Sequence, residues 1–373
     1  MGRINVGLLI QEGALKVEEI VVAGYEKVYK IEDPSVGLQA IICLHSLALG
    51  PALGGIRIYP YTSWDAALTD VKRLAEAMSY KASISSCSLG GGKSVIIAAP
   101  HQKTEELLRS FGRAIELLGG VYIGAEDVGS SPADILVLSQ VTKYVTGLPH
   151  KKSSGNPSAF TAWGVYRGIQ AGLKEVYGSE SVKGKTVAIQ GVGSVGSFLA
   201  DMLFWNGAHL VVADVSVEKA QDIARKYGGT YVSSDEIFSI PCDVFAPCAL
   251  GGILNSAMIP DLKCKIVAGA ANNQLLVESD ADILRSRGIL YAPDFVINAG
   301  GLLNVTEEIM PEGYNPVQVR EKIDGIWNTL LMIFALAEEQ NCSTHEAAKK
   351  MARYHIENKI GARTQPPCFH HAL

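Results

Sequence analysis

The sequence predicts an α/β protein of two domains, and three observations support that prediction. A chain of 373 residues is long enough to bury two hydrophobic cores. Apolar runs of strand length alternate with segments of helical period along the chain. Between Thr146 and Pro157 the composition shifts to glycine, proline, serine and lysine, which is typical of a linker and hinge. We therefore expect one domain in residues 1–147 plus about 343–373, and the other in residues 148–342.

The first domain is predicted to mix strands with two amphipathic helices. We expect strands at 27–31, 38–44, 95–100 and 121–125, and helices at 64–79, after Ser63, and at 104–118. The glycine-rich stretch Gly50–Arg57 is predicted to be a loop. Lys81 would lie just past the first helix, at its carbonyl end, where a positive charge is favoured.

The stretch from Tyr80 to Ser94 holds two lysines, Lys81 and Lys93, separated by small side chains and three consecutive glycines. Glycines let another group approach the backbone closely, so a lysine here can be desolvated. A neighbouring cation such as Lys81 would lower the pKa of Lys93 further and suit it to general acid/base chemistry. A surface turn is the simpler alternative. A phosphate-binding loop is excluded, because Cys87 stands where that motif needs glycine and a strand follows.

A pair of carboxylates, Glu126 and Asp127, follows the expected strand 121–125. A carboxylate at the end of a strand, next to glycine, is a frequent active-site placement. It is also a common turn residue, and this pair taken alone favours the turn.

The second domain carries a dinucleotide-binding pattern. Gly191, Gly193 and Gly196 follow the apolar strand 186–190 and lead into an apolar helix. The next strand, 209–213, ends in Asp214. This context predicts a Rossmann-type domain whose helix N-terminus meets a pyrophosphate. Asp214 would bind the ribose hydroxyls and repel a 2′-phosphate, so NAD is expected rather than NADP.

Further strand–helix units complete this domain. Strands are expected at 243–246, 265–268 and 289–291, and helices at 159–177, 197–205 and 317–340. Cys248 has no histidine near it in sequence, so a wall residue is favoured over a nucleophile. Ser343–Glu346 forms a capping box that opens a last helix, which we expect to return to the first domain. His370 and His371 are interpreted as a frayed tail rather than a metal site.

Composition excludes several classes of partner. The net charge is −5, and no basic run suited to nucleic acid is present. No secretory signal and no apolar run of the ~20 residues needed to span a membrane is found. The seven cysteines form no C-x-x-C pair, which favours reduced thiols in the cytoplasm over disulfides or zinc. No resident metal is expected.

Six motifs in one order resemble the amino acid dehydrogenase family that includes the glutamate, leucine, phenylalanine and valine enzymes, with the leucine enzymes as the nearest branch. The likeness runs from about Gly50 to Gly361. The motifs are Pro51–Gly55, Leu89–Lys93, Ala125–Gly129, Ser154–Pro157, Pro247–Gly252 and Val296–Gly301.

The resemblance implies NAD-dependent, reversible oxidative deamination of an L-amino acid. Lys81 would bind the substrate α-carboxylate, Lys93 would activate the attacking water, and Asp127 would exchange protons with the substrate nitrogen. Asn273 would contact substrate or nicotinamide. The residues expected to bind the cofactor are Thr161, Gly191, Gly193, Ser194, Val195, Gly196, Asp214, Cys248, Ala249 and Asn273.

The resemblance also implies an apolar substrate side chain. Glutamate enzymes of the family have a lysine at the position of Leu53 and a serine at that of Val305, so a buried substrate carboxylate would lack partners here. The expected pocket residues are Leu53, Gly54, Ala125, Leu302 and Val305. Ala125 matches the leucine enzymes, whereas Leu302 is closer to the phenylalanine enzymes. We expect leucine, isoleucine and valine as substrates, with phenylalanine as the alternative.

Two other functions stay open at this point. A 2-hydroxy acid dehydrogenase would share the fold, but those enzymes usually use a catalytic histidine, and none of the eight histidines lies in a motif of the expected cleft. A non-catalytic NAD-binding regulator would not need Lys81, Lys93 and Asp127 together. By analogy with the family, we also expect a homo-oligomer, from dimer to octamer, formed through the first domain.

Overall fold

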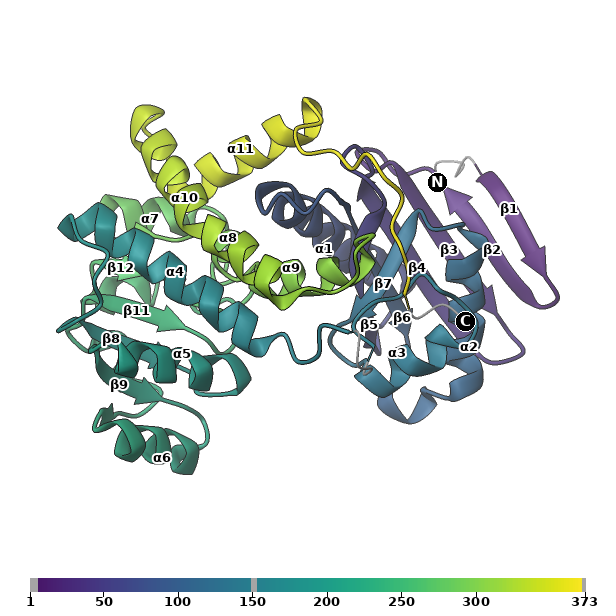
Figure 1. The fold of residues 1–373 in the computed structure, drawn as a ribbon. Coiled ribbons are helices and arrows are strands. Elements are labelled where there is room, and N and C mark those ends of the chain that lie inside the picture. Colours follow the sequence, from purple (N-terminus) through teal and green to yellow (C-terminus); the bar gives the residue numbers. More distant parts are fainter. Residues whose placement is uncertain (1–5, 149–152, 371–373) are drawn as a thin grey trace. The chain divides into compact units, whose positions relative to one another are not determined.

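The computed structural model describes residues 6–148 and 153–370 (Figure 1). The chain divides into two compact units. The first unit comprises Met1–Gly155, Val305–Asn315 and Ala352–Leu373, and the second Asn156–Asn304 and Pro316–Met351. The expected functional domains, 1–147 plus about 343–373 and 148–342, stay a prediction. The predicted linker includes residues 149–152, which lie outside the described residues.

A mixed sheet forms the centre of the first unit, in the order β1-β2-β3-β4-β6-β5-β7. Its strands are β1 (Val6–Glu12), β2 (Leu15–Ile20), β3 (Lys27–Asp33), β4 (Leu38–Ser46), β5 (Ala52–Tyr59), β6 (Gly90–Ile97) and β7 (Tyr122–Glu126). The strands from β1 to β4 are antiparallel to their neighbours, and β6 is antiparallel to β4. In contrast, β5 runs parallel to both β6 and β7.

The stretch from Gly50 to Arg57, which was expected to be a loop, runs into β5. The three glycines before Lys93 open β6, so the alternative of a surface turn there is wrong as well. The prediction was wrong because these glycines serve close packing rather than turning. A Cβ on Gly54 would lie 1.8 Å from the carbonyl oxygen of Gly92 in the neighbouring strand.

Helices cover both faces of this sheet (Figure 1). One face packs against α1 (Trp64–Ile84), through a core that includes Val71, Cys43 and Val95. The other face packs against α2 (Glu105–Leu117) and α3 (Pro132–Ser139), through a core that includes Phe111 and Leu138. Each large side chain buried in this way contributes about 1.5–3 kcal/mol.

The first residues of α1 and α2 agree with the prediction, but the last residue of α1 does not. Ser63 accepts a hydrogen bond from the backbone N–H of Ala66, and Thr104 accepts one from that of Leu107, which confirms both expected starts. However, α1 ends at Ile84 and not near Ser79, so Lys81 lies in its last turn. The helix continues because its last residues include Ala82 and Ile84, which are buried.

The second unit is built on a parallel sheet in the order β10-β9-β8-β11-β12-β13. Its strands are β8 (Thr186–Gln190), β9 (His209–Ala213), β10 (Thr230–Tyr231), β11 (Val244–Pro247), β12 (Ile266–Val267) and β13 (Leu290–Tyr291). The chain starts at β8, in the middle, and moves outward in both directions. This order is that of a Rossmann-type domain, in which the strand order reverses between β8 and β11. Proteins with such sheets generally bind dinucleotides at the carboxyl ends of the strands at this point.

The remaining helices lie close to the predicted ranges where a prediction was made. They are α4 (Ser158–Tyr177), α5 (Ser194–Trp205), α6 (Val217–Tyr227), α7 (Asp280–Ser286), α8 (Asp294–Ile297), α9 (Gly300–Thr306), α10 (Pro316–Glu339) and α11 (Thr344–Glu357). Short 3-10 helices are η1 (Pro100–Gln102), η2 (Glu236–Ser239), η3 (Ile259–Asp261) and η4 (Glu307–Ile309). The hydroxyl of Ser343 accepts from the N–H of Glu346, as expected for the start of α11.

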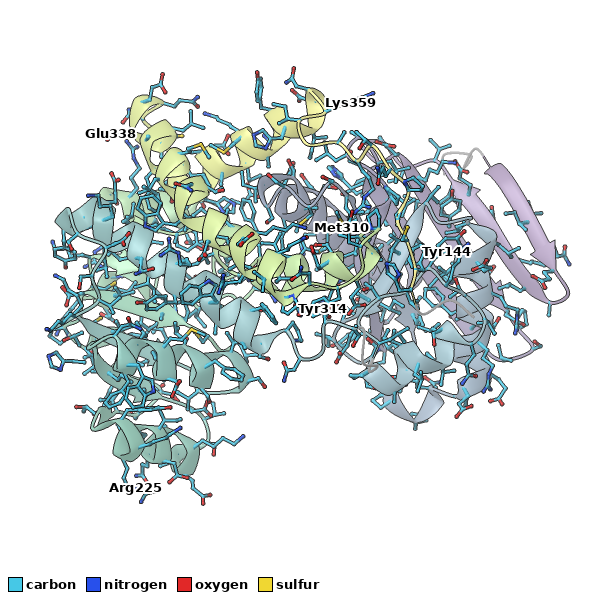
Figure 2. All side chains as sticks on the ribbon, in the orientation of Figure 1. Tyr144, Arg225, Met310, Tyr314, Glu338 and Lys359 are labelled. Atoms are coloured by element: carbon cyan, nitrogen blue, oxygen red, sulfur yellow. The ribbon has the colours of Figure 1, made fainter. Side chains whose placement is uncertain are left out.

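The C-terminal segment belongs to the first unit from Ala352 onward, whereas the first half of α11 belongs to the second unit. His370 lies 2.8 Å from the carbonyl oxygen of Met310, and Phe369 packs edge-on against Tyr144 (both partners are labelled in Figure 2). The interpretation as a frayed tail was therefore wrong for His370, because this residue has a hydrogen-bond partner. His371 lies outside the described residues.

Three further features concern the described residues as a whole. No helix among them is long and apolar enough to cross a membrane. No group of three or more histidine, cysteine, aspartate or glutamate side chains in that part of the chain has the arrangement of a metal site. All seven cysteines are free thiols.

Candidate functional site

The first unit gathers charged side chains on the face of its sheet that α1 covers. Strand pairing places Lys93 of β6 level with Gly55 of β5, and Gly55 pairs with Ala125 of β7. Because side chains alternate along a strand, Arg57 points to the same face as these residues. Asp127 follows β7 directly and reaches the same place.

Lys93 and Asp127 form a close ion pair. The Nζ of Lys93 lies 3.0 Å from Oδ1 of Asp127, and Lys93 is only 6% exposed. Gly55 makes room for this pair, since a Cβ added there would lie 2.9 Å from the Lys93 Nζ and 2.6 Å from the Asp127 Cβ. The predicted catalytic residues are thus brought together.

Burial lowers the pKa of Lys93, because removal from water penalises the charged form of an amine. Asp127 opposes this effect by attracting the cation, and Arg57 adds to it by repulsion. The sequence predicted a depressed pKa for Lys93. It named Lys81 as the neighbouring cation, and that role of Lys81 stays a prediction, whereas Arg57 was not foreseen.

Arg57 belongs to this charged cluster and was not predicted from the sequence. Its Nε donates to Oδ2 of Asp127 at 3.0 Å, and its Nη1 donates to Oδ2 of Asp70 at 2.9 Å. Asp70 also accepts from the hydroxyl of Tyr61 at 2.6 Å. A period of two from Gly55 would have placed Arg57 on the face of Lys93, but the stretch was expected to be a loop.

The backbone of Asp127 is fixed by its own turn. Its N–H donates to the hydroxyl of Ser130 at 2.9 Å, and this hydroxyl donates back to the Asp127 carbonyl at 3.0 Å. Gly129 adopts φ +83°, which a side chain would disfavour, and a Cβ there would collide with the carbonyl oxygen of Ile58. Asp127 is therefore held in a turn, as one of the two alternatives predicted, and its place in an active site stays a prediction.

The other expected substrate residues of the first unit lie on several elements. Lys81 is half-buried in the last turn of α1, and α1 packs against β6. Leu53 and Gly54 are buried in β5, and Ala125 is half-buried in β7. The carbonyl oxygen of Val305 accepts from the hydroxyl of Thr146 at 3.2 Å. Asn273 and Leu302 belong to the second unit, so their meeting with these residues stays a prediction.

In the second unit, the three glycines after β8 have distinct environments. Gly191 has φ +94°, as a tight turn requires. Gly196, in the first turn of α5, lies so close to the glycine turn that a Cβ there would be 2.0 Å from the Gly191 carbonyl oxygen. Around Gly193, no described atom outside its chain neighbours lies within 4 Å of an added Cβ. These are the conditions that a bound dinucleotide needs: a turn, close helix packing and open space beside the backbone.

The first turn of α5 follows directly after these glycines. Ser194 and Val195 begin the helix, where backbone N–H groups have no partner within the helix and attract anions. Asp214, at the end of β9, accepts from the N–H of Val192 and from that of Ser216, both at 2.8 Å. These bonds orient the carboxylate beside the glycine turn.

The remaining expected cofactor residues lie around the same sheet edge or near α4. Cys248 follows β11, and burial raises the pKa of its thiol to about 12, which disfavours a nucleophile. Ala249 approaches Gly191, where a Cβ would lie 2.7 Å from its own Cβ. Thr161 lies in the first turn of α4, and its hydroxyl donates to the Pro157 carbonyl at 3.1 Å.

Asn273 occupies a strained and exposed position after β12. It has φ +51°, a conformation that few residues other than glycine adopt and that often marks a functional site. Two side-chain amides hold the loop that contains it. The amide of Gln274 donates to the carbonyl oxygens of Gly269 and Ala271. The amide of Asn298 donates to the carbonyl oxygen of Ala270 and to the side-chain oxygen of Asn272. The loop is thus preorganised around Asn273.

Two family models match the chain. One, described as the Glu/Leu/Phe/Val dehydrogenase dimerisation domain, matches residues 25–144, and one described as Glutamate/Leucine/Phenylalanine/Valine dehydrogenase matches residues 213–361. The leucine dehydrogenase of Geobacillus stearothermophilus is 47% identical over 91% of this chain and 93% of its own length. The phenylalanine dehydrogenase of Lysinibacillus sphaericus is 42% identical over 91% and 90%. The crystal structure of L-tryptophan dehydrogenase from Nostoc punctiforme is similar with a TM-score of 0.82 and 43% identity, covering 90% of this chain and 97% of that one.

Proposed function

The chain belongs to the Glu/Leu/Phe/Val dehydrogenase family, and from this premise we propose that it oxidises an apolar L-amino acid to the 2-oxo acid and ammonia. The preferred substrates are leucine, isoleucine and valine. The observation that carries the proposal is the buried pair of Lys93 and Asp127, whose charged atoms lie 3.0 Å apart. Such a pair can move protons at a reacting carbon or nitrogen without a protein nucleophile.

Three charged residues of the first unit have a role in this reaction. Lys81 binds the substrate α-carboxylate as a positive charge on the last turn of α1. Lys93, in its neutral form, takes a proton from the water that attacks the substrate carbon after oxidation. Asp127 gives a proton to the departing nitrogen and takes one back in the reverse direction. A buried lysine suits this task because its lowered pKa makes the neutral form accessible.

The second unit fits a nicotinamide cofactor, which when bound accepts the hydride from the substrate. Family membership supports a nicotinamide in general, and Asp214 supports NAD in particular. Its carboxylate is held beside the glycine turn, where it would accept hydrogen bonds from ribose hydroxyls. The same charge would repel the 2′-phosphate of NADP.

The substrate pocket is apolar on the side of the first unit. Leu53 and Ala125 are aliphatic, and they lie on the face of the sheet that carries Lys93. A glutamate side chain buried against them would lose several kcal/mol of hydration without a partner. Phenylalanine is the second candidate, because Leu302 resembles the phenylalanine branch. The leucine, phenylalanine and tryptophan enzymes among the relatives all act on apolar amino acids by name.

We also propose a homo-oligomer in a reducing compartment such as the cytoplasm. The matched model for residues 25–144 is described as a dimerisation domain, which supports association through the first unit. The seven free thiols support a reducing environment. Sedimentation velocity tests the assembly, and a monomer at micromolar concentration would contradict it.

The test of the function is cofactor reduction with a panel of amino acids. The appearance of reduced cofactor is followed at mildly alkaline pH with leucine, isoleucine, valine, phenylalanine, tryptophan, glutamate and 2-hydroxyisocaproate, each with NAD and with NADP. We expect the highest kcat/KM for an aliphatic amino acid with NAD. A preference for glutamate, or for the hydroxy acid, would contradict the proposal. Preference for phenylalanine would assign the pocket to the alternative substrate class.

A further inference from the structure

We infer that Arg57 is a positioning residue for the acid/base step, because it holds one oxygen of Asp127 so that the other faces Lys93. The inference rests on the proposed function and names a residue of the same site. Arg57 lies in β5, two positions after Gly55, and its guanidinium bridges two carboxylates.

The geometry divides the two oxygens of Asp127 between two cations. Oδ1 lies 3.0 Å from the Lys93 Nζ, and Oδ2 lies 3.0 Å from the Arg57 Nε. A carboxylate with one partner can rotate and exchange its oxygens. With Oδ2 bound to Arg57, a proton enters and leaves at Oδ1, on the side of Lys93.

The guanidinium is itself held at its far end. Its Nη1 donates to Oδ2 of Asp70 in α1 at 2.9 Å. Tyr61 donates to the same oxygen, and Arg73 donates to the other oxygen of Asp70 at 3.2 Å. The guanidinium group of Arg57 is planar. Because its Nη1 is bound to Asp70, the direction of its Nε–H toward Asp127 is fixed as well.

Arg57 also belongs to the set of charges that faces Lys93. Burial lowers the pKa of Lys93 most, Asp127 raises it, Arg57 lowers it and Asp70 raises it. The strand partner of Lys93 on β4 is Cys43. Lys81 is the cation in the last turn of α1. Removing the Arg57 charge should therefore raise the pH at which Lys93 becomes neutral.

The experiment compares Arg57→Gln with Arg57→Lys in the full-length enzyme. We expect Arg57→Gln to lower kcat about 100-fold, as misplacement of a reacting group by about 1 Å does. The rising limb of kcat/KM for leucine should move to higher pH, so that alkaline pH restores part of the activity. Arg57→Lys keeps the positive charge but loses the two directed N–H groups that bridge Asp70 and Asp127. Its kcat should therefore fall, while kcat/KM should rise with pH over the same range as in the wild type.

Arg109→Gln is the matched control, since Arg109 bonds Glu105 and Gln140 on α2 and near α3, away from this cluster. It should leave kcat and the pH limb unchanged. If Arg57→Gln fails to fold, Asp70→Asn tests the same idea, because it loosens the anchor and should lower kcat by a smaller factor. Wild-type kcat and pH dependence in Arg57→Gln, or in a folded Asp70→Asn, would overturn the inference.

The two proposals fail in different ways. If the wild type reduces no cofactor with any amino acid, the proposed function fails. If the wild type is active and Arg57→Gln matches it, only the role of Arg57 fails. A loss of activity that follows the fraction of folded protein, with an unchanged pH limb, would assign Arg57 to stability alone.

Discussion

Lys93 combines burial with a positive charge, and this combination determines the chemistry available at the site. Its ammonium is removed from water and compensated by Asp127 at 3.0 Å. A solvated lysine stays protonated up to a pH of about 10.4. Because burial lowers the pKa of Lys93, its neutral form is populated at a lower pH than that of a solvated lysine, and only the neutral form of an amine can accept a proton.

This predicts the pH dependence of the forward reaction. In the proposed mechanism the neutral form of Lys93 is the active one, so kcat/KM for leucine should rise with pH and level off below the titration range of a solvated lysine. The measurement is kcat/KM from neutral pH to about 11, with the folded state checked by circular dichroism at each pH. A limb that rises only near the value of a free lysine would contradict the role of burial.

Single residues were predictable from sequence where a motif carried them. Lys93 and Asp127 stand beside glycines in two separate motifs, and the structure brings them into contact. Arg57 stands in no recognised pattern, because its meaning depends on strand pairing between β5 and β6. That pairing joins residues far apart in sequence, and a single sequence does not specify it.

At the scale of elements, glycines in β5 and β6 allow neighbouring groups to lie directly against the strands. Gly54 permits close contact with β6, and Gly91 permits close contact with α1, since a Cβ there would lie 2.0 Å from the Ser79 backbone nitrogen. Gly55 leaves the space that Lys93 and Asp127 use. The strands are therefore glycine-rich because side chains and a helix occupy the volume above them.

Gly55→Ala should separate the ion pair. The new Cβ would lie 2.6 Å from the Asp127 Cβ and 2.9 Å from the Lys93 Nζ, so one of them must move. We expect kcat for leucine to fall about 100-fold, with a smaller effect on cofactor affinity.

Gly325→Ala is the control for Gly55→Ala. Gly325 lies inside α10, and apart from its chain neighbours and the adjacent backbone of the helix no described atom lies within 4 Å of its added Cβ. Alanine should stabilise this helix by up to about 1 kcal/mol and leave kcat unchanged. Equal activity of the two variants would show that the space beside Gly55 is not used by the reaction.

Helices and strands were predictable where the residues that determine them are neighbours in the sequence. In the second unit, β8 and β9 match the expected ranges, because short apolar strands there are separated by turn residues. In the first unit, β5 was missed because glycine is usually a loop signal. Only the packing of β5 against β6 and Asp127 explains glycine in a strand.

At the scale of the whole molecule, the chain passes from one unit to the other at several points. Glu308 lies shortly after one of these points and binds residues that lie shortly before another. Its Oε2 accepts from the Thr146 hydroxyl at 2.6 Å and from the Gly147 N–H at 2.9 Å. Its Oε1 accepts from the Ser154 N–H at 2.6 Å. All these residues belong to the first unit, so Glu308 joins two segments of one unit that are distant in sequence.

Replacing Glu308 should therefore destabilise the first unit. Glu308→Ala leaves buried donors without an acceptor, which costs about 3 kcal/mol. We expect a lower melting temperature by calorimetry, with the matched variant Glu312→Ala unchanged because Glu312 is exposed in the same segment. A melting temperature of Glu308→Ala equal to that of the wild type would show that these hydrogen bonds do not hold the segments together.

In the proposed mechanism, the first unit carries out the proton transfers and the second unit binds the cofactor. The most direct test is leucine-dependent reduction of NAD by Lys93→Ala, with binding of NADH measured on the same sample. We predict a loss of turnover of about 10²–10⁴-fold with unchanged NADH affinity, since general acid/base catalysis contributes that much. Turnover close to that of the wild type would contradict the central role of Lys93.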